Sequence, residues 1–176
     1  MHARITVIEV LVGFSIALLM SVVLSIAMDR YKYIKELLYP MMVITQTVPI
    51  MAIAPLMMIW FGFGLTPKII VVVLVCFFPI AVSLTEGLAS VDPELIDLMR
   101  TMDANETQIF MKCKLPASLP SFFAGLRIAA TYSVMGAVVS EWVGAQEGLG
   151  IFMTRVMKSY RTPALFAVII FIIAIT

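Results

Sequence analysis

Residues 92–116, with the sequence DPELIDLMRTMDANETQIFMKCKLP, form the only long polar interval in an otherwise strongly apolar chain. An aspartate followed by a proline, and an asparagine followed three residues later by a glutamine, are typical of helix starts. The stretch therefore predicts two short helices joined by a tight turn. A membrane protein that folds its one sizeable loop in this way is expected to present the helix pair to a soluble partner.

The composition predicts a membrane protein. Of the 176 residues, 62% are hydrophobic and 13% are charged, whereas soluble domains have about 25% charged residues. The length fits one domain, and the expected fold is an all-α, polytopic helical membrane protein. A net charge of +1 indicates no strongly charged partner such as nucleic acid. Cys76 lies in an apolar run and Cys113 in the polar loop, so neither a disulfide nor a metal site is expected.

Apolar runs place four complete spans and part of a fifth. The predicted spans are residues 5–28, 37–63, 69–85 and 122–143, with an incomplete span at 164–176. The last run is too short because a spanning helix needs about 20 residues. The polar loop then covers residues 86–121, and the chain is expected to end inside its last helix.

The second run contains Pro40, Pro49 and Pro55. Proline removes a backbone donor and kinks a helix, which membranes tolerate where neighbours or a water-filled cavity satisfy the freed carbonyls. Two interpretations stay open, a kinked packing helix or a pore-lining segment around Thr45, Gln46, Thr47 and Pro49. Gln46 favours the second interpretation, because it is the only amide side chain inside the spans.

Two spans carry small residues at every fourth position. These are Gly13, Ala17, Ser21 and Ser25 in the first span, and Gly125, Ala129, Ser133 and Ala137 in the fourth. Small side chains at this spacing let helix backbones approach closely in lipid. The rows predict close helix packing and say little about chemistry.

The distribution of basic residues favours a cytoplasmic polar loop. In that orientation seven lysines and arginines lie on the cytoplasmic side and five on the other side. Basic residues are enriched in cytoplasmic loops. Residues 29–36 would then also be cytoplasmic, and residues 144–163 would lie outside.

Inside the loop, Asp92 is expected to cap a helix that begins at Pro93. The apolar residues of this helix share one face at helical spacing: Leu95, Leu98, Met99 and Met102. Asn105 and Gln108 resemble a capping box that opens a second helix. The apolar face of the second helix is Ile109, Phe110 and Cys113, with Pro116 expected to end the helix and Pro120 to open the next span. The alternative is a helix pair that lies on the membrane surface.

The stretch from Asp97 to Pro116 resembles the cytoplasmic EAA loop of bacterial ABC-importer permeases. That pattern reads E-A-A, three residues, glycine, about nine residues, then I-x-L-P. Here residues 97–99, Asp-Leu-Met, occupy the E-A-A positions, Asp103 occupies the glycine position, and residues 114–116, Lys-Leu-Pro, close the loop. Aspartate is among the few residues other than glycine that adopt a left-handed conformation, so the turn at Asp103 is expected to survive.

Flanking stretches extend the resemblance over almost the whole chain: QTVP at 46–49, WFGFG at 60–64, VDPE at 91–94, GLRIAA at 125–130, SEWVG at 140–144 and GLG at 148–150. They are similar to the branch of permeases that imports nitrate, sulfonates, taurine and pyrimidine precursors of thiamine. Members of that branch usually have six spans. The resemblance therefore implies a type I permease fold that lacks the first span and ends within the last.

The resemblance also implies partners and a location in a bacterial or archaeal cell membrane. The loop would dock into a groove on a separate ATPase subunit, which would hold the ATP and Mg, because this chain has no G-x-x-x-x-G-K-[ST] phosphate loop and no cofactor of its own. An external binding protein would deliver the solute, and a second permease copy would complete a homodimeric pore. The expected loop residues are Asp97, Leu98, Met99, Met102, Asp103, Ile109, Phe110, Leu115 and Pro116.

Other function classes fit the sequence less well. An enzyme is disfavoured because His2 is the only histidine and no serine or cysteine has a plausible base in its span. The main rival is a secondary transporter or a structural subunit with an interfacial helix pair. Against proton coupling, Glu9, Glu86 and Glu141 lie near span ends.

Two further charged residues leave alternatives open. Glu141, beside Trp142, is expected to be either an interfacial anchor or a polar, pore-lining gate at the outer mouth. Arg127 is expected near the start of its span, as a snorkelling residue or a clamp for the loop. By resemblance, the first substrate to consider is a pyrimidine thiamine precursor, ahead of sulfonate, taurine, nitrate and riboflavin.

Overall fold

The computed structural model describes residues 2–176, and every regular element in that range is helical. The elements are α1 (His2–Arg30), α2 (Lys32–Thr45), α3 (Ile50–Phe61), α4 (Leu65–Ala89), α5 (Pro93–Thr101), α6 (Glu106–Ile109), a short π-helix (Phe110–Lys114), α7 (Leu115–Glu141), α8 (Leu149–Lys158) and α9 (Thr162–Ile175). The predicted all-α class is confirmed.

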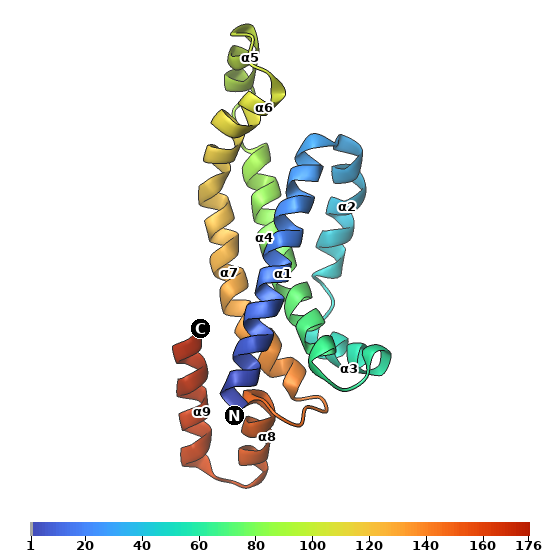
Figure 1. Ribbon diagram of the computed structural model, residues 1–176, viewed down its shortest axis with the longest axis vertical. Coiled ribbons are helices and arrows are strands. Elements are labelled where there is room, and N and C mark those ends of the chain that lie inside the picture. The colour runs from blue at the N-terminus through green and yellow to red at the C-terminus, as the bar shows by residue number, and fades with distance from the viewer. Residues whose placement is uncertain (1) are drawn as a thin grey trace.

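Helix α4 forms the centre of the bundle and packs against both α1 and α7 (Figure 1). The predicted small-residue rows of α1 and α7 are buried. A Cβ atom at Gly13 would come within 2.6 Å of Val72, so the two backbones approach as closely as the row predicts. The hydroxyls of Ser21 and Ser25 donate to backbone carbonyls of α4, at 2.9 and 3.0 Å.

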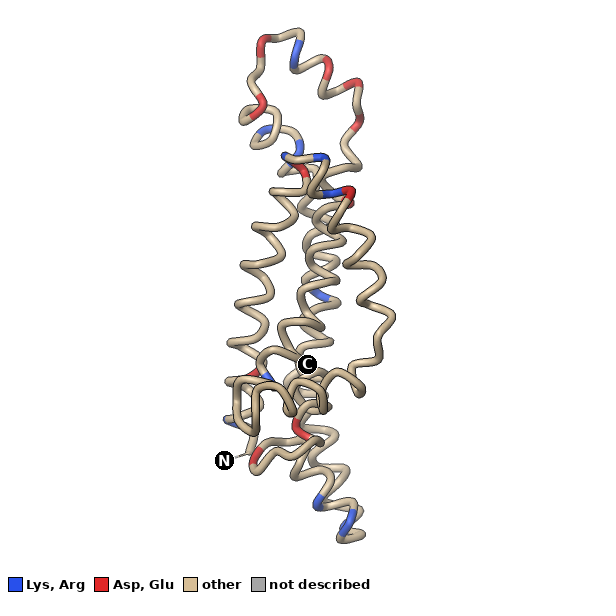
Figure 2. Tube along the Cα trace, turned by 90° about the vertical axis from the view of Figure 1, so that its right-hand side faces the viewer, with Lys and Arg blue, Asp and Glu red and all other residues tan. Residues whose placement is uncertain are grey.

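Within residues 2–176, three helical runs are long and apolar enough to cross a membrane: His2–Arg30, Leu65–Ala89 and Glu106–Glu141. Charged positions gather at the two ends of the bundle, and the length between them is almost entirely uncharged (Figure 2). One end, here called the loop end, carries α5 and α6 projecting beyond the bundle. The opposite end carries α8, from which α9 runs back along the bundle (Figure 1).

The predicted second span, residues 37–63, is two helices rather than one kinked helix. Helices α2 and α3 meet at an angle of 102° across the break at residues 46–49. Pro49 explains where the break falls, because it occupies the N-cap of α3 with an extended backbone and cannot donate to a preceding turn. Pro40 and Pro55 lie inside their helices.

The expected boundary between the loop and the last complete span is also different. Pro116 was expected to end a helix and Pro120 to open another, yet the helical run continues through both, from Glu106 to Glu141. The π-helix directly before Pro116 gives the physical reason. The Leu115 N–H bonds the carbonyl of Phe110, five residues back, and this wider turn gives room to a following proline ring.

Candidate functional site

The projecting helix pair is built by capping. The Asp92 carboxylate accepts the Glu94 N–H at 2.9 Å, and Pro93 occupies the first turn of α5, as predicted. Asn105 and Gln108 form the predicted capping box at the start of α6, with reciprocal bonds of 2.8 and 2.9 Å. These bonds satisfy backbone donors that helix starts otherwise leave unpaired, so the two short helices have defined first turns.

The turn between the two helices is left-handed at Asp103, with φ of 57°. The Ala104 N–H reaches back to the carbonyl of Met99 at 3.0 Å, which closes the end of α5. This is the geometry in which glycine is usual and aspartate is tolerated. The predicted left-handed turn at Asp103 is therefore confirmed.

The apolar face of α5 has no cover within the described residues. Leu98 is 56% exposed and Met102 is 75% exposed, and Met99 is half-buried. Asp97 is exposed beside them and forms an ion pair with Arg100 at 3.4 Å. An exposed apolar cluster on a projecting element is typical of a contact surface for another protein.

The predicted docking residues from Ile109 onward are less exposed than Leu98 and Met102, except for Pro116. Ile109 is 1% exposed and faces the chain's own core, so it supports the helix pair and offers no surface to a partner. Phe110 and Leu115 are half-buried, and Pro116 is exposed. The exposed apolar cluster is thus centred on α5, while the residues after α6 attach the pair to the bundle.

Ion pairs fix the base of the helix pair to the end of α1. Lys114 contacts Asp29 at 2.7 Å, with both side chains largely buried. Glu106 lies 3.3 Å from Arg100 and 4.0 Å from Arg30. Sequence reasoning missed these links, because nothing in the local pattern shows that the end of α1 meets the π-helix.

The break between α2 and α3 borders a hollow of about 340 Å³. The predicted residues Thr45, Gln46 and Pro49 all line it, together with side chains of α4 and with Tyr132 and Met135 of α7. The structure thus brings these three residues together at a concave, partly polar surface. The pore-lining role itself stays a prediction.

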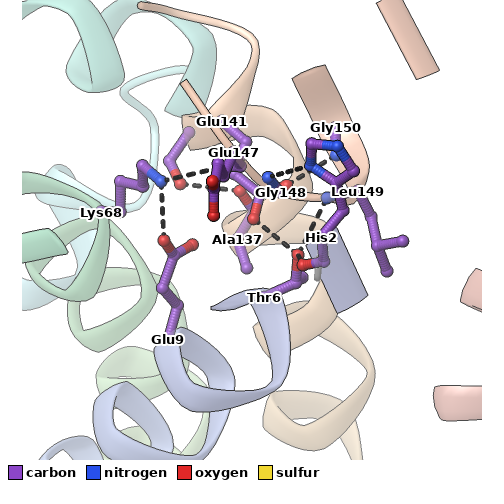
Figure 3. Close-up of polar contacts among 11 residues, drawn as sticks. His2, Thr6, Glu9, Lys68, Ala137, Glu141, Glu147, Gly148, Leu149 and Gly150 are labelled. Carbon is purple, nitrogen blue, oxygen red and sulfur yellow. Dashed lines mark hydrogen bonds and ion pairs between the residues drawn. The ribbon is translucent and has the colours of Figure 1, made fainter. Parts of the chain in front are cut away.

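A buried polar cluster occupies the opposite end of the bundle (Figure 3). Its members are Thr6 and Glu9 of α1, Lys68 of α4, Glu141 of α7, and the backbone of residues 147–150 that leads into α8. The Lys68 ammonium lies 2.7 Å from the Glu9 carboxylate, and both side chains are almost fully buried. Lys68 also donates to the backbone carbonyl of Glu147, at 3.4 Å.

Glu141 holds the start of α8 and does not line the hollow. It is 0% exposed, accepts the Thr6 hydroxyl at 2.6 Å and accepts the Gly150 N–H at 2.6 Å. Both expectations for Glu141, an interfacial anchor and a pore-lining gate, are therefore corrected. The physical reason is that a carboxylate in an apolar helix is stabilised where hydrogen-bond donors converge on it, and the N-terminus of α8 supplies such a donor.

Sequence reasoning missed the other members of this cluster. His2 accepts the Gly148 N–H at Nδ1, at 3.0 Å, and stacks on Phe152. Glu9 is the only charged residue in its predicted span. A charged residue inside an apolar helix usually pairs with another charge, so the sequence indicates that Glu9 has a charged partner. The partner, Lys68, lies directly before the predicted span of residues 69–85, so the sequence does not identify it.

No group of three or more metal-ligating side chains lies together within residues 2–176. Cys76 and Cys113 are both free and buried. The arrangement therefore comprises an exposed apolar cluster on α5, a hollow and a buried polar cluster.

Known proteins similar to this chain fit the arrangement. The family described as binding-protein-dependent transport system inner membrane component matches residues 10–176. The formylaminopyrimidine transport permease protein ThiX of Halalkalibacterium halodurans is 39% identical over 166 residues, which cover 94% of this chain and 66% of that relative. A probable ABC transporter permease protein of Haemophilus influenzae is 34% identical, over 99% of this chain and 71% of that protein.

Two further similarities involve lower identity. The taurine transport system permease protein TauC of Escherichia coli is 30% identical over 94% of this chain and 60% of that protein. A crystal structure of an amino acid ABC transporter with histidines superposes with a TM-score of 0.74 at 18% identity, over 99% of this chain and 83% of that one. The fold is thus that of an ABC transporter permease. The chain belongs to the family of binding-protein-dependent transport system inner membrane components.

Proposed function

We propose that the chain is the permease subunit of an ATP-driven importer and forms the translocation pore for a small polar solute. The projecting helix pair carries this proposal. Its caps and its ion pairs to α1 hold it in place, and the Leu98 and Met102 side chains are left uncovered. A rigid element with an exposed apolar face at the end of a membrane bundle is suited to docking a soluble subunit.

The partner at this surface would be an ATPase subunit, which would supply ATP hydrolysis with its Mg. This chain contains no phosphate-binding loop motif, and relatives such as ThiX are named as permeases. A binding protein on the other side of the membrane would deliver the solute, and a second copy of the permease would complete the pore. The name of the matching family supports the binding protein.

The proposed substrate is a small polar solute, with a formylated aminopyrimidine precursor of thiamine considered first. The relative named for formylaminopyrimidine transport is 39% identical, whereas those named for aliphatic sulfonates and taurine are each 30% identical. Sulfonates and taurine therefore come next, and riboflavin follows from a relative that is 32% identical over 82% of the chain.

The buried polar cluster argues against the rival of a proton-coupled secondary transporter. In such proteins, ionisable residues at membrane depth face a solute or ion pathway. Here Glu9 and Glu141 are both 0% exposed and are held by Lys68, Thr6 and the start of α8. Neither carboxylate reaches an open path from this position.

The test is co-purification of this chain with the ATPase subunit of its importer. We expect Leu98→Asp to abolish co-purification with the ATPase, because a buried leucine contributes about 1.5–3 kcal/mol and an unpaired carboxylate in the interface adds a desolvation cost. Tyr160→Asp is the matched control, since Tyr160 is 93% exposed at the opposite end and already left-handed, with φ of 53°. Retained capture with Leu98→Asp, at wild-type membrane insertion, would show that α5 does not dock the ATPase.

A further inference from the structure

Arg127 lies at the middle of helix α7. It is 13 residues after Lys114 and 14 residues before Glu141, which places it about 20 Å along the helix from each of them. Lys114 belongs to the charged loop end, and Glu141 belongs to the polar cluster at the opposite end. Arg127 is thus far from both, and the expectation that it lies near the start of a span does not hold.

Arg127 differs from the other charged residues inside the long helices. Glu9 and Lys68 form a buried ion pair, and Glu141 accepts two hydrogen bonds. The Arg127 side chain is exposed, and within residues 2–176 its guanidinium makes no hydrogen bond or ion pair. Only its backbone carbonyl has a side-chain contact, from the Thr131 hydroxyl at 3.3 Å. The described residues therefore supply no partner for this guanidinium.

Lipid is a poor partner at this depth. A charged side chain at the bilayer centre costs several kcal/mol. Arginine lowers this cost by extending its head to the interface, but half of a hydrocarbon core is about 15 Å thick. A guanidinium at the middle of α7 would have to cross this distance to reach the interface, and one side chain is too short for that.

A tight contact with a second copy of the chain would not neutralise Arg127 either. The acidic residues of the long helices are Glu9, Glu141, Asp29 and Glu86. The first two are fully buried in the polar cluster, Asp29 pairs with Lys114 at the loop end, and Glu86 lies in the last turn of α4, where it accepts the Tyr39 hydroxyl. None of these carboxylates is free at the depth of Arg127, so a water-filled space fits the guanidinium better than a dry interface.

The hollow at the broken helix meets α7 a little more than one turn beyond Arg127, at Tyr132. Thr131, one turn further along α7, is exposed and bonds the Arg127 carbonyl. Its neighbour Tyr132 is 42% exposed and lines the hollow of about 340 Å³ that also includes Gln46 and Thr47. Neither Arg127 nor Thr131 lines the hollow itself, which begins at Tyr132 at the edge of the exposed side of α7.

We propose that Arg127 lines the solute path at mid-depth and donates a pair of hydrogen bonds to the passing solute. The proposal rests on the permease function proposed above. A guanidinium presents a rigid fork of N–H donors that matches two neighbouring acceptor atoms. The transported solute is then one with hydrogen-bond acceptors and no net positive charge, such as a sulfonate or a formylated aminopyrimidine, and cationic solutes are excluded.

The first experiment measures whether position 127 faces water. Arg127→Cys is made in a background with Cys76→Ala and Cys113→Ala, and the complex with its ATPase is treated, during ATP turnover, with a water-soluble sulfonatoethyl methanethiosulfonate. Leu19→Cys is the control, because Leu19 is 68% exposed on an apolar face of α1. We expect the cysteine at position 127 to react at least tenfold faster. Equal, slow reaction at both positions would place Arg127 in lipid and overturn the proposal, whether or not the complex transports any solute.

The second experiment measures uptake by the reconstituted complex, with radiolabelled taurine and formylaminopyrimidine as probes. Arg127→Met removes the donors and is expected to lower uptake of the transported probe about tenfold or more, since hydrogen bonds to a charged group are stronger than those between neutral groups. Arg127→Lys keeps the charge and loses the fork, so it should retain taurine uptake better than formylaminopyrimidine uptake. Wild-type uptake by Arg127→Met would overturn the proposal, whereas failure of the wild-type complex to transport either probe counts against the proposed substrates.

Discussion

At the scale of single residues, Asp103 shows how a local conformation shapes the contact surface. Its φ of 57° turns the chain between α5 and α6. We expect Asp103→Gly to be tolerated, because glycine adopts this conformation without strain. Asp103→Val should weaken the turn by about 1–2 kcal/mol, since a left-handed conformation brings Cβ too close to the carbonyl oxygen. Limited proteolysis of residues 92–109 should be faster for the valine variant, and equal cleavage of both variants would contradict the turn.

Gly148 provides a second prediction at this scale, in the buried polar cluster. Its φ is 138°, and a Cβ atom there would overlap the Glu141 carboxylate. We expect Gly148→Ala to destabilise the protein by about 1–3 kcal/mol and to lower its Tm in detergent. Gly64→Ala is the control, because a Cβ atom at Gly64 would meet nothing within 4 Å and its extended backbone suits any residue. A Tm that falls equally for both variants would mean that Glu141 does not need this close approach.

These two residues also show what sequence patterns can predict. Asp92, Asn105 and Asp103 act on backbone groups a few residues away, so short motifs predict them correctly. The contact of Gly148 with Glu141, and that of Glu9 with Lys68, join segments far apart in the chain. Such pairs depend on how the helices pack, which periodicity within one helix does not encode. The same limit explains why Glu141 was expected at a pore or an interface.

At the scale of elements, the small-residue rows set how closely α7 approaches α4. A Cβ atom at Gly125 would lie 2.6 Å from the Pro79 carbonyl and from the Ser83 Cβ. We expect Gly125→Ala to separate these helices and to cost about 1–3 kcal/mol, seen as a lower Tm. Gly136→Ala, on the same helix, is the control, because its nearest neighbours would be 3.6 Å away. If Gly125→Ala left the Tm unchanged, the close packing of α4 and α7 would be wrong.

Composition predicts most of the elements, but it does not predict how α2, α3 and the loop connect. Long apolar runs identify α1, α4 and α7 because length and hydropathy suffice for a spanning helix. Pro49 and Pro116 both lack a backbone N–H. The chain nevertheless bends sharply at Pro49 and stays helical through Pro116. Surrounding structure decides between them: a π-helix makes room for Pro116, whereas residues 46–49 border an open hollow.

At the scale of the whole molecule, one helical run connects its two polar ends. The run from Glu106 to Glu141 contains 36 residues, about 54 Å of helix. At the loop end Glu106 and Lys114 tie it to α1, and at the opposite end Glu141 ties it to Thr6 and to α8. We therefore expect a displacement of the projecting helix pair to be transmitted along this run to the polar cluster at the opposite end.

The final prediction concerns the number of copies. One chain presents one projecting pair and one hollow beside the broken helix, and Arg127 is exposed on α7. A closed, water-filled path needs a second wall, and a second copy related by a twofold axis would supply it and would present a second loop to a second ATPase. Native mass measurement of the detergent-solubilised complex should give two permease copies and two ATPase subunits. A stable, transport-competent complex with one permease copy would contradict this, because the Arg127 guanidinium would then have to face lipid.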